Sequence, residues 1–251
     1  MPSSPHPFAS PSHPVQHGQQ ARSLHSWSLA TQAALALQGA CLLATALFTP
    51  LFALGSVLPI GDLWSVIAAV STLVTTVSVL AALAAIIGWL RWQWLASSLV
   101  AHSTEAGSAP DPRGASAVRR SPTWHLLSWV IPVIALWYPL QNVADLDREG
   151  WRREHNPAAP ARPARTGDPG SGLRRLWWSC WLAWSVVSTL GMNAGSMTLT
   201  LLGHLLGVAA AGTAVLLVRR ISDALTGRTS PLPEILRTWG WVGPAPTPAA
   251  S

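Results

Sequence analysis

Residues 63–90 read LWSVIAAVSTLVTTVSVLAALAAIIGWL and contain no Asp, Glu, Lys or Arg. An uncharged apolar stretch of about 18 residues or more is long enough to cross a bilayer as an α-helix. It is also far longer than a β-strand, and backbone groups in lipid must find their hydrogen bonds within the segment itself. The stretch therefore predicts a membrane-spanning helix, and the chain is predicted to be all-α.

The rest of the chain extends this pattern into a helical bundle of an integral membrane protein. Only 10% of the 251 residues are charged, against about 25% in a soluble domain, so there is too little charge to cover a soluble surface. Charge is absent from three further runs, 23–61, 121–144 and 176–218. Within these runs and the first stretch, four transmembrane helices are predicted at about 27–48, 63–90, 177–194 and 198–218.

The apolar segment 124–140 is different, because it is short and contains Pro132 and Pro139. Each proline removes a backbone donor and obstructs a helix, and the Trp and Tyr rings of the segment favour the headgroup level of a membrane. We predict a re-entrant or interfacial segment that packs against the bundle. The alternative is a fifth transmembrane helix.

Arginine placement orients the predicted helices. Loops rich in Arg stay on the cytoplasmic side, which favours a cytoplasmic location for both termini and both middle loops, in a cell (plasma or inner) membrane. The membrane domain is then 27–220, with cytoplasmic loops at 91–123 and 141–176. Residues 1–26 are predicted to be a disordered Pro/Ser/His-rich cytoplasmic tail, and 221–251 a polar, mostly disordered tail.

Several kinds of chemistry are disfavoured by composition. All 16 basic residues are Arg, which removes any lysine-dependent chemistry, and the two cysteines, Cys41 and Cys180, cannot form a four-thiolate zinc site. We therefore expect no metal and no cofactor. We also expect no nucleic-acid partner, because the Arg residues are dispersed over the loops between apolar spans. Anionic lipid headgroups are the expected partners of the basic residues Arg91, Arg152, Arg153, Arg174, Arg175, Arg219 and Arg220.

A few residues inside the spans could have a specific role. His204 lies in the last span, where an ionisable group suggests a proton or ligand site; the favoured interpretation is a neutral imidazole that hydrogen-bonds a neighbouring helix. Gly203, Gly207 and Ala211 recur at four-residue spacing, which predicts close helix packing within the chain or in a homo-oligomer. Three tryptophans on one helical face, Trp177, Trp181 and Trp184, are interpreted as an interface belt or core rather than a ligand cage.

The Pro/Trp segment carries a resemblance to a known family. It reads SPTWHLLSWVIP over 121–132 and LWYPLQ over 136–141, followed by Asp145-Leu146. This pattern resembles a bacterial membrane family catalogued as domain of unknown function 4328, and the similarity extends over about 28–222. The matching motif positions are Trp124, Trp129, Pro132, Trp137, Pro139 and Gln141. Four positions depart from the family's usual residues: Ala135 for Asn, Tyr138 for Arg, Leu140 for Tyr and Asp147 for Trp.

The resemblance implies a membrane protein with no assigned activity, so three functions are weighed from the residues. The first is a structural or partner-binding protein that uses the cytoplasmic Pro/Trp segment and basic loop. The second is a pore or carrier for a small neutral solute, which would need a polar path through Gln32, Gln38, Thr72, Thr75, Thr76 and His204. The third, a membrane enzyme on lipids using Asp145, Asp147, Glu149 and His155, is the least favoured.

Overall fold

The computed structural model describes residues 13–55, 61–107, 121–129, 131, 134–155 and 170–228. Over these ranges the chain is helical and has no β-strand. The elements in chain order are α1 (His13–Gly55), α2 (Asp62–Gly107), α3 (Pro122–Leu127), the 3-10 helix η1 (Ile134–Leu136), α4 (Tyr138–His155), α5 (Ser171–Ala194) and α6 (Met197–Thr226). The prediction of an all-helical fold is confirmed for this part of the chain.

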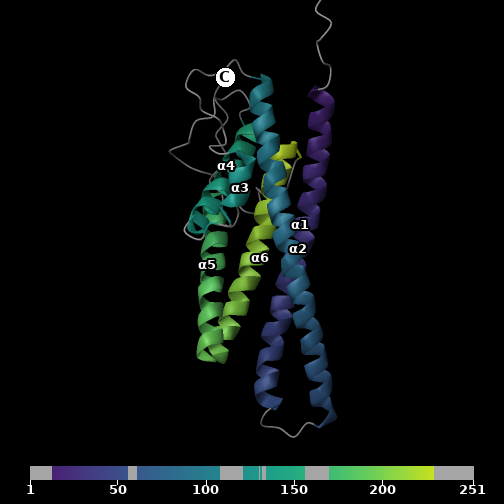
Figure 1. Cartoon of the computed structure of the whole chain (residues 1–251), viewed down its shortest axis with the longest axis vertical. Coiled ribbons are helices and arrows are strands. Elements are labelled where there is room, and N and C mark those ends of the chain that lie inside the picture. The colour runs from purple at the N-terminus through teal and green to yellow at the C-terminus, as the bar shows by residue number, and fades with distance from the viewer. Residues whose placement is uncertain are drawn as a thin grey trace, which may run out of the picture.

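The long helices form two antiparallel hairpins, α1 with α2 and α5 with α6, which pack together where α6 lies against α1 (Figure 1). The C-terminal end of α1 lies at the same end of the molecule as the turn between α5 and α6. We call this the turn end. Helices α3 and α4 lie at the other end, which we call the cap end (Figure 1). The outer helices α2 and α5 do not pack along their lengths.

The surface of the bundle is apolar over the predicted spans. Three helical stretches, Gly18–Leu51, Trp64–Ala101 and Met197–Thr226, are long and apolar enough to cross a membrane. Only 11% of the most apolar window in α2 is buried inside the bundle, and Leu73 and Leu80 are more than 60% exposed. A soluble protein rarely leaves so large an apolar surface open to water, so these helices are suited to a lipid environment.

Helix α1 begins at His13, which corrects the prediction of a disordered tail over residues 13–26. Leu24 is fully buried and belongs to the main apolar cluster, so packing offsets the entropy of ordering this polar stretch. Residues 1–12 lie outside the described part. At the other terminus α6 continues to Thr226, because Ile221 and Leu225 are buried on the same core face, and the predicted tail therefore starts later than 221.

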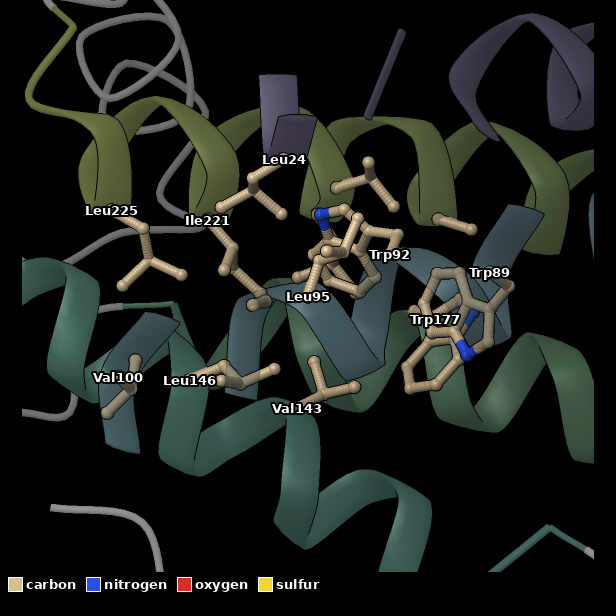
Figure 2. Packing of buried hydrophobic residues seen from close by; sticks show 14 of the residues in the cluster. Leu24, Trp89, Trp92, Leu95, Val100, Val143, Leu146, Trp177, Ile221 and Leu225 are labelled. Atoms are coloured by element: carbon tan, nitrogen blue, oxygen red, sulfur yellow. The ribbon is translucent and has the colours of Figure 1, made fainter. Parts of the chain in front are cut away.

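Helix α2 also continues beyond its predicted end. The loop predicted at 91–123 is helical as far as Gly107. The reason is a buried stripe at helical spacing that packs against the cap end, formed by Trp92, Leu95, Ala96, Leu99 and Val100. Figure 2 shows how Trp92, Leu95 and Val100 meet Val143 and Leu146 of α4 and Ile221 and Leu225 of α6.

The Pro/Trp segment does not form one continuous helix. It is divided into the six residues of α3 and the three of η1, each too short to cross a bilayer. Pro139 is buried in the first turn of α4, where a proline is tolerated because its missing N–H would have no partner in the helix. Pro132 lies outside the described residues. The following helix begins at Tyr138, earlier than the loop predicted from residue 141.

Candidate functional site

A buried ion-pair cluster holds α4 to helices α5 and α6. Arg220 of α6 donates from Nε to Oδ1 of Asp147 at 3.1 Å, and Nη1 of Arg174 in α5 donates to Oδ2 of the same carboxylate. All three side chains are less than 10% exposed. Two guanidinium groups therefore share one carboxylate in a site without bulk water, and the shared contact fixes three helices to each other.

The backbone before α5 makes room for this cluster. Gly170 has a φ of +103°, and a Cβ at this position would lie 2.6 Å from Cζ of Arg220. Both the left-handed backbone and the close approach require glycine. The chain therefore enters α5 directly over the guanidinium of Arg220.

The other acidic residues of α4 are also engaged by arginines. Asp145 pairs with Arg148 at 3.1 Å, and Glu149 accepts from Arg152 at 2.6 Å and from Arg153 at 2.8 Å. Burial raises the pKa of the Glu149 carboxyl, but the hydrogen bonds and charges of the two arginines outweigh it and leave the pKa below its usual value. Glu149 is thus ionised at neutral pH.

The proposed catalytic cluster of the enzyme hypothesis therefore consists of carboxylates that are already bound to arginines. The side chain of His155 lies outside the described residues. Among the described residues no group of three or more His, Cys, Asp or Glu is placed to hold a metal ion.

Three side-chain hydrogen bonds lie within the cap and the part of the bundle next to it. The indole N–H of Trp129 donates to Oε1 of Gln93 in α2 at 2.8 Å. Nδ2 of Asn142 in α4 donates to Oγ of Ser128 at 3.0 Å, directly after α3. In the core, Trp92 donates to Oγ of Ser222 at 2.8 Å and ties α2 to α6. The short elements α3 and α4 are therefore held in fixed positions by side-chain bonds as well as by apolar contacts.

The motif residues of the Pro/Trp segment fall into two groups. Trp129 and Pro139 face the protein, whereas Trp124, Trp137 and Gln141 are exposed. The exposed apolar residues of the segment are Trp124, Leu127, Ile131, Leu136 and Trp137. Exposed rings of this kind are typical of residues at a membrane interface.

A polar cleft of 270 Å³ lies between α4 and the start of α5. We call it the basic cleft; it is lined by Leu140, Gln141, Ala144, Asp145, Arg148, Ser171, Arg174 and Arg175. Within it, Asp145 is balanced by Arg148, and Arg174 is bound to Asp147. Arg175 is exposed, so the open side of the cleft is positively charged.

A second, apolar cleft of 420 Å³ lies among α1, α2, α5 and α6. We call it the tryptophan cleft; its aromatic wall consists of Trp89, Trp129, Trp177, Trp181 and Trp184. The rings support each other, with Trp89 and Trp177 at 5.1 Å between centroids and Trp129 edge-on to Trp181 at 5.9 Å. The three tryptophans that were interpreted as belt or core thus line a cavity, which the spacing along one helix could not reveal.

The small residues of α6 contact helices of the same chain. A Cβ at Gly203 would lie 2.6 Å from Oγ of Ser188 in α5, and one at Gly207 would lie 2.8 Å from a methyl carbon of Leu42 in α1. The Cβ of Ala211 lies 3.3 Å from where a Cβ on Gly39 would be. The stripe therefore brings α6 close to both α5 and α1.

The arginines predicted to contact headgroups occupy two different environments. Arg91, Arg175 and Arg219 are exposed, and the guanidinium of Arg91 lies 4.7 Å from the ring of Trp94. Arg152 and Arg153 are partly exposed and bound to Glu149. For Arg174 and Arg220 the prediction was wrong, because both are buried against Asp147. The signal for this pairing was an acid at residue 147 on the apolar face of α4, one turn after Val143.

The polar residues of the pore hypothesis do not line a common path. Thr72, Thr75 and Thr76 are exposed on α2 and donate to carbonyls of their own helix. Gln38 bonds to Ser78, and Nδ1 of His204 lies 2.7 Å from the carbonyl of Thr200, again within one helix. A carbonyl only accepts, so this contact places the proton of His204 on Nδ1. The imidazole thus bonds its own helix rather than a neighbouring one.

Comparison with known proteins identifies one match. The model of a family described as "Domain of unknown function (DUF4328)" matches residues 56–223. The match runs from just before α2 to Asp223 in the last turn of α6 and includes the Pro/Trp segment and Asp147, but not α1. No curated protein and no solved structure matches the chain.

Proposed function

The chain belongs to the family described as a domain of unknown function (DUF4328), and from its geometry we propose that it is a membrane-anchored binding protein rather than an enzyme. Four helices cross the membrane, and the cap end faces the cytoplasm. The basic cleft is the docking site, and it receives an acidic segment of a cytoplasmic protein. The observation that carries the proposal is the fixed, positively charged cleft beside the exposed rings of the Pro/Trp segment.

The described arginines support this orientation. Three arginines border the charge-free stretches that run to the turn end: Arg91, Arg175 and Arg219. The other described arginines lie further toward the cap end. The positive-inside rule then places the cap in the cytoplasm. Helix α5 has 24 residues and a length of about 36 Å, enough to span a hydrocarbon core of about 30 Å and to serve as the fourth crossing.

Alkaline phosphatase fusions test the topology. Fusions after Asp62 and Asn193, at the turn end, are expected to be active because the enzyme folds only outside the cytoplasm. Fusions after Arg113, Arg165 and Arg228 are expected to be inactive. High activity at Arg165 together with inactivity at Arg113 would show that the Pro/Trp segment crosses the membrane and would contradict the four-helix topology.

The basic cleft suits an acidic peptide for both shape and charge. Gln141 and Ser171 offer hydrogen-bonding groups, and Arg175 leaves the open side positive. The ion pairs of Asp147 fix the two walls relative to each other, so little order has to be gained on binding. Trp124 and Trp137, at the membrane interface, would hold this surface next to the bilayer, where a partner would meet it.

Site-specific photocrosslinking tests the docking surface. A photoreactive residue in place of the exposed Gln141 is expected to crosslink a protein in native membranes. The crosslink should weaken with added salt, since exposed charges are screened over about 8 Å at physiological ionic strength. Arg175→Glu is expected to abolish it because the reversed charge repels an acidic segment.

The matched control is Arg219→Glu, which reverses an exposed arginine on α6 outside the cleft and should leave the crosslink intact. Equal loss in both variants would show a general effect of charge. Crosslinking to lipid alone would assign the cleft to anionic headgroups. Either result would overturn the proposed protein partner.

A further inference from the structure

We propose that the tryptophan cleft holds an acyl chain of an ester-linked membrane phospholipid, with the indole N–H of Trp89 donating to an ester carbonyl. The proposal goes beyond partner binding at the cap and uses none of the residues of the basic cleft. It rests on the part of the proposed function that places α5 in the membrane beside α2.

The shape of the cleft follows from the packing of the four helices. Helices α1 and α6 form its floor, and α2 and α5 form two walls that do not pack along their lengths. The residues of α6 that line the cleft are small and leave its volume open: Gly207, Ala210, Ala211 and Ala214. The volume of 420 Å³ falls within the range of about 300–1,000 Å³ for small-molecule sites.

The lining selects an apolar occupant. Apart from Gln38 and the indole N–H groups, the cleft presents only hydrocarbon and aromatic carbon, and Gln38 is already bonded to Ser78. A polar ligand would lose its hydrogen bonds to water without replacing them. Ile86 lines the cleft and is 55% exposed, so the cleft is continuous with the apolar surface that faces lipid. A lipid chain can therefore enter sideways from the bilayer.

Trp89 lines the cleft and carries a buried indole donor. Its side chain is 7% exposed, and its Nε1 has no acceptor among the residues that the structure describes. A buried donor without an acceptor is costly, which makes a ligand oxygen at this position favourable. The first charge after the span is Arg91, two residues later, so Trp89 lies at the edge of the hydrocarbon. Ester carbonyls of phospholipids lie at this depth.

The volume of the tryptophan cleft favours a single acyl chain over a helix from a second copy of the protein. An α-helix is about 10 Å across and rises about 5.4 Å per turn, so one turn would fill a space of roughly the size of the cleft. Such an insertion would leave the rest of the helix outside. An extended acyl chain is narrow enough to occupy the length of the cleft.

Native mass spectrometry of the purified full chain in detergent tests the proposal. Dioleoyl phosphatidylglycerol is the probe, and its diether analogue, which lacks both ester carbonyls, is the comparison. The diester is expected to bind about threefold to tenfold more tightly, as one neutral hydrogen bond allows. In Trp89→Phe this preference should disappear, because an aromatic ring, although a smaller one, remains and the N–H donor is lost. Equal binding of both lipids to the wild-type protein would overturn the hydrogen bond.

A cavity-filling variant tests whether the acyl chain of the lipid occupies the cleft. Ala82 lines the cleft, and Ala82→Phe is expected to weaken binding of the diester by about tenfold or more, since the added ring occupies the space of the chain. The control Ala84→Phe lies two residues away on the exposed side of α2 and should bind normally. Unchanged binding in Ala82→Phe, or lipid-free dimers instead of lipid adducts, would overturn the proposal. Because no partner protein is present, these outcomes are independent of the crosslinking at the cap.

Discussion

Asp147→Ala is expected to lower the free energy of unfolding by about 3–5 kcal/mol, the largest loss that we expect from a single substitution in this protein. The variant removes the carboxylate that Arg174 and Arg220 share and leaves their two guanidinium groups buried near each other. The positive charges would then repel each other in a site with little water. The loss should appear in detergent as unfolding at a lower dodecyl sulfate fraction, followed by tryptophan fluorescence.

The control for this prediction is the pair of Arg219 and Asp223 at the protein surface. Nε of Arg219 lies 3.9 Å from Oδ2 of Asp223, and the two side chains are 47% and 18% exposed. Asp223→Ala should change the unfolding free energy by about 0.5 kcal/mol or less, because an exposed pair gains little in water. A similar loss for both variants would mean that burial does not determine the strength of the Asp147 cluster.

Gly203→Leu is expected to destabilise the bundle by about 1–3 kcal/mol. A side chain at this position would meet not only Oγ of Ser188 but also its backbone, with Cα and N both 3.3 Å from the new Cβ. A serine hydroxyl can rotate away, but a helix backbone cannot, so α5 and α6 would have to separate. The same unfolding measurement in detergent applies.

Gly212→Leu provides the matched comparison on the same helix. Nothing lies within 4 Å of a Cβ at Gly212, and the residue is exposed. This variant should be neutral or slightly stabilising, because leucine favours a helix more than glycine does. If both leucines were equally harmful, the effect would come from the loss of glycine itself and not from the contact with α5.

The long apolar helices were predictable from the sequence because the requirement for a helix suited to lipid is local. A helix in lipid must pair its own backbone and expose apolar side chains, so residues 63–90 show their role without reference to any other segment. The break at the Pro/Trp segment was predictable for the same reason, since proline acts on the turn in which it lies. The exact form of the segment was not predictable, because Pro139 lies in the first turn of α4 and does not interrupt that helix.

The helix ends were less predictable because they depend on distant partners. The polar composition of residues 13–26 predicts disorder when the segment is considered alone. It is helical from His13, with Leu24 buried among α2 and α6 residues in the core cluster. In the same way, Trp92 and Val100 extend α2 only because α4 and α6 cover them.

By itself, the sequence determined that the chain is helical, where its long apolar segments lie and which family it resembles. Only the tertiary structure decided what the charged and aromatic residues do. The sequence predicts a headgroup contact for Arg174. Its buried bond to Asp147, 27 residues away along the chain, is evident only once α4 and α5 are placed together. Likewise, the sequence indicates only a belt or core position for Trp177, and its place opposite Trp89 in one cleft depends on how α2 and α5 are arranged. Both outcomes depend on contacts between segments far apart in the sequence, and no local pattern specifies which segments will meet.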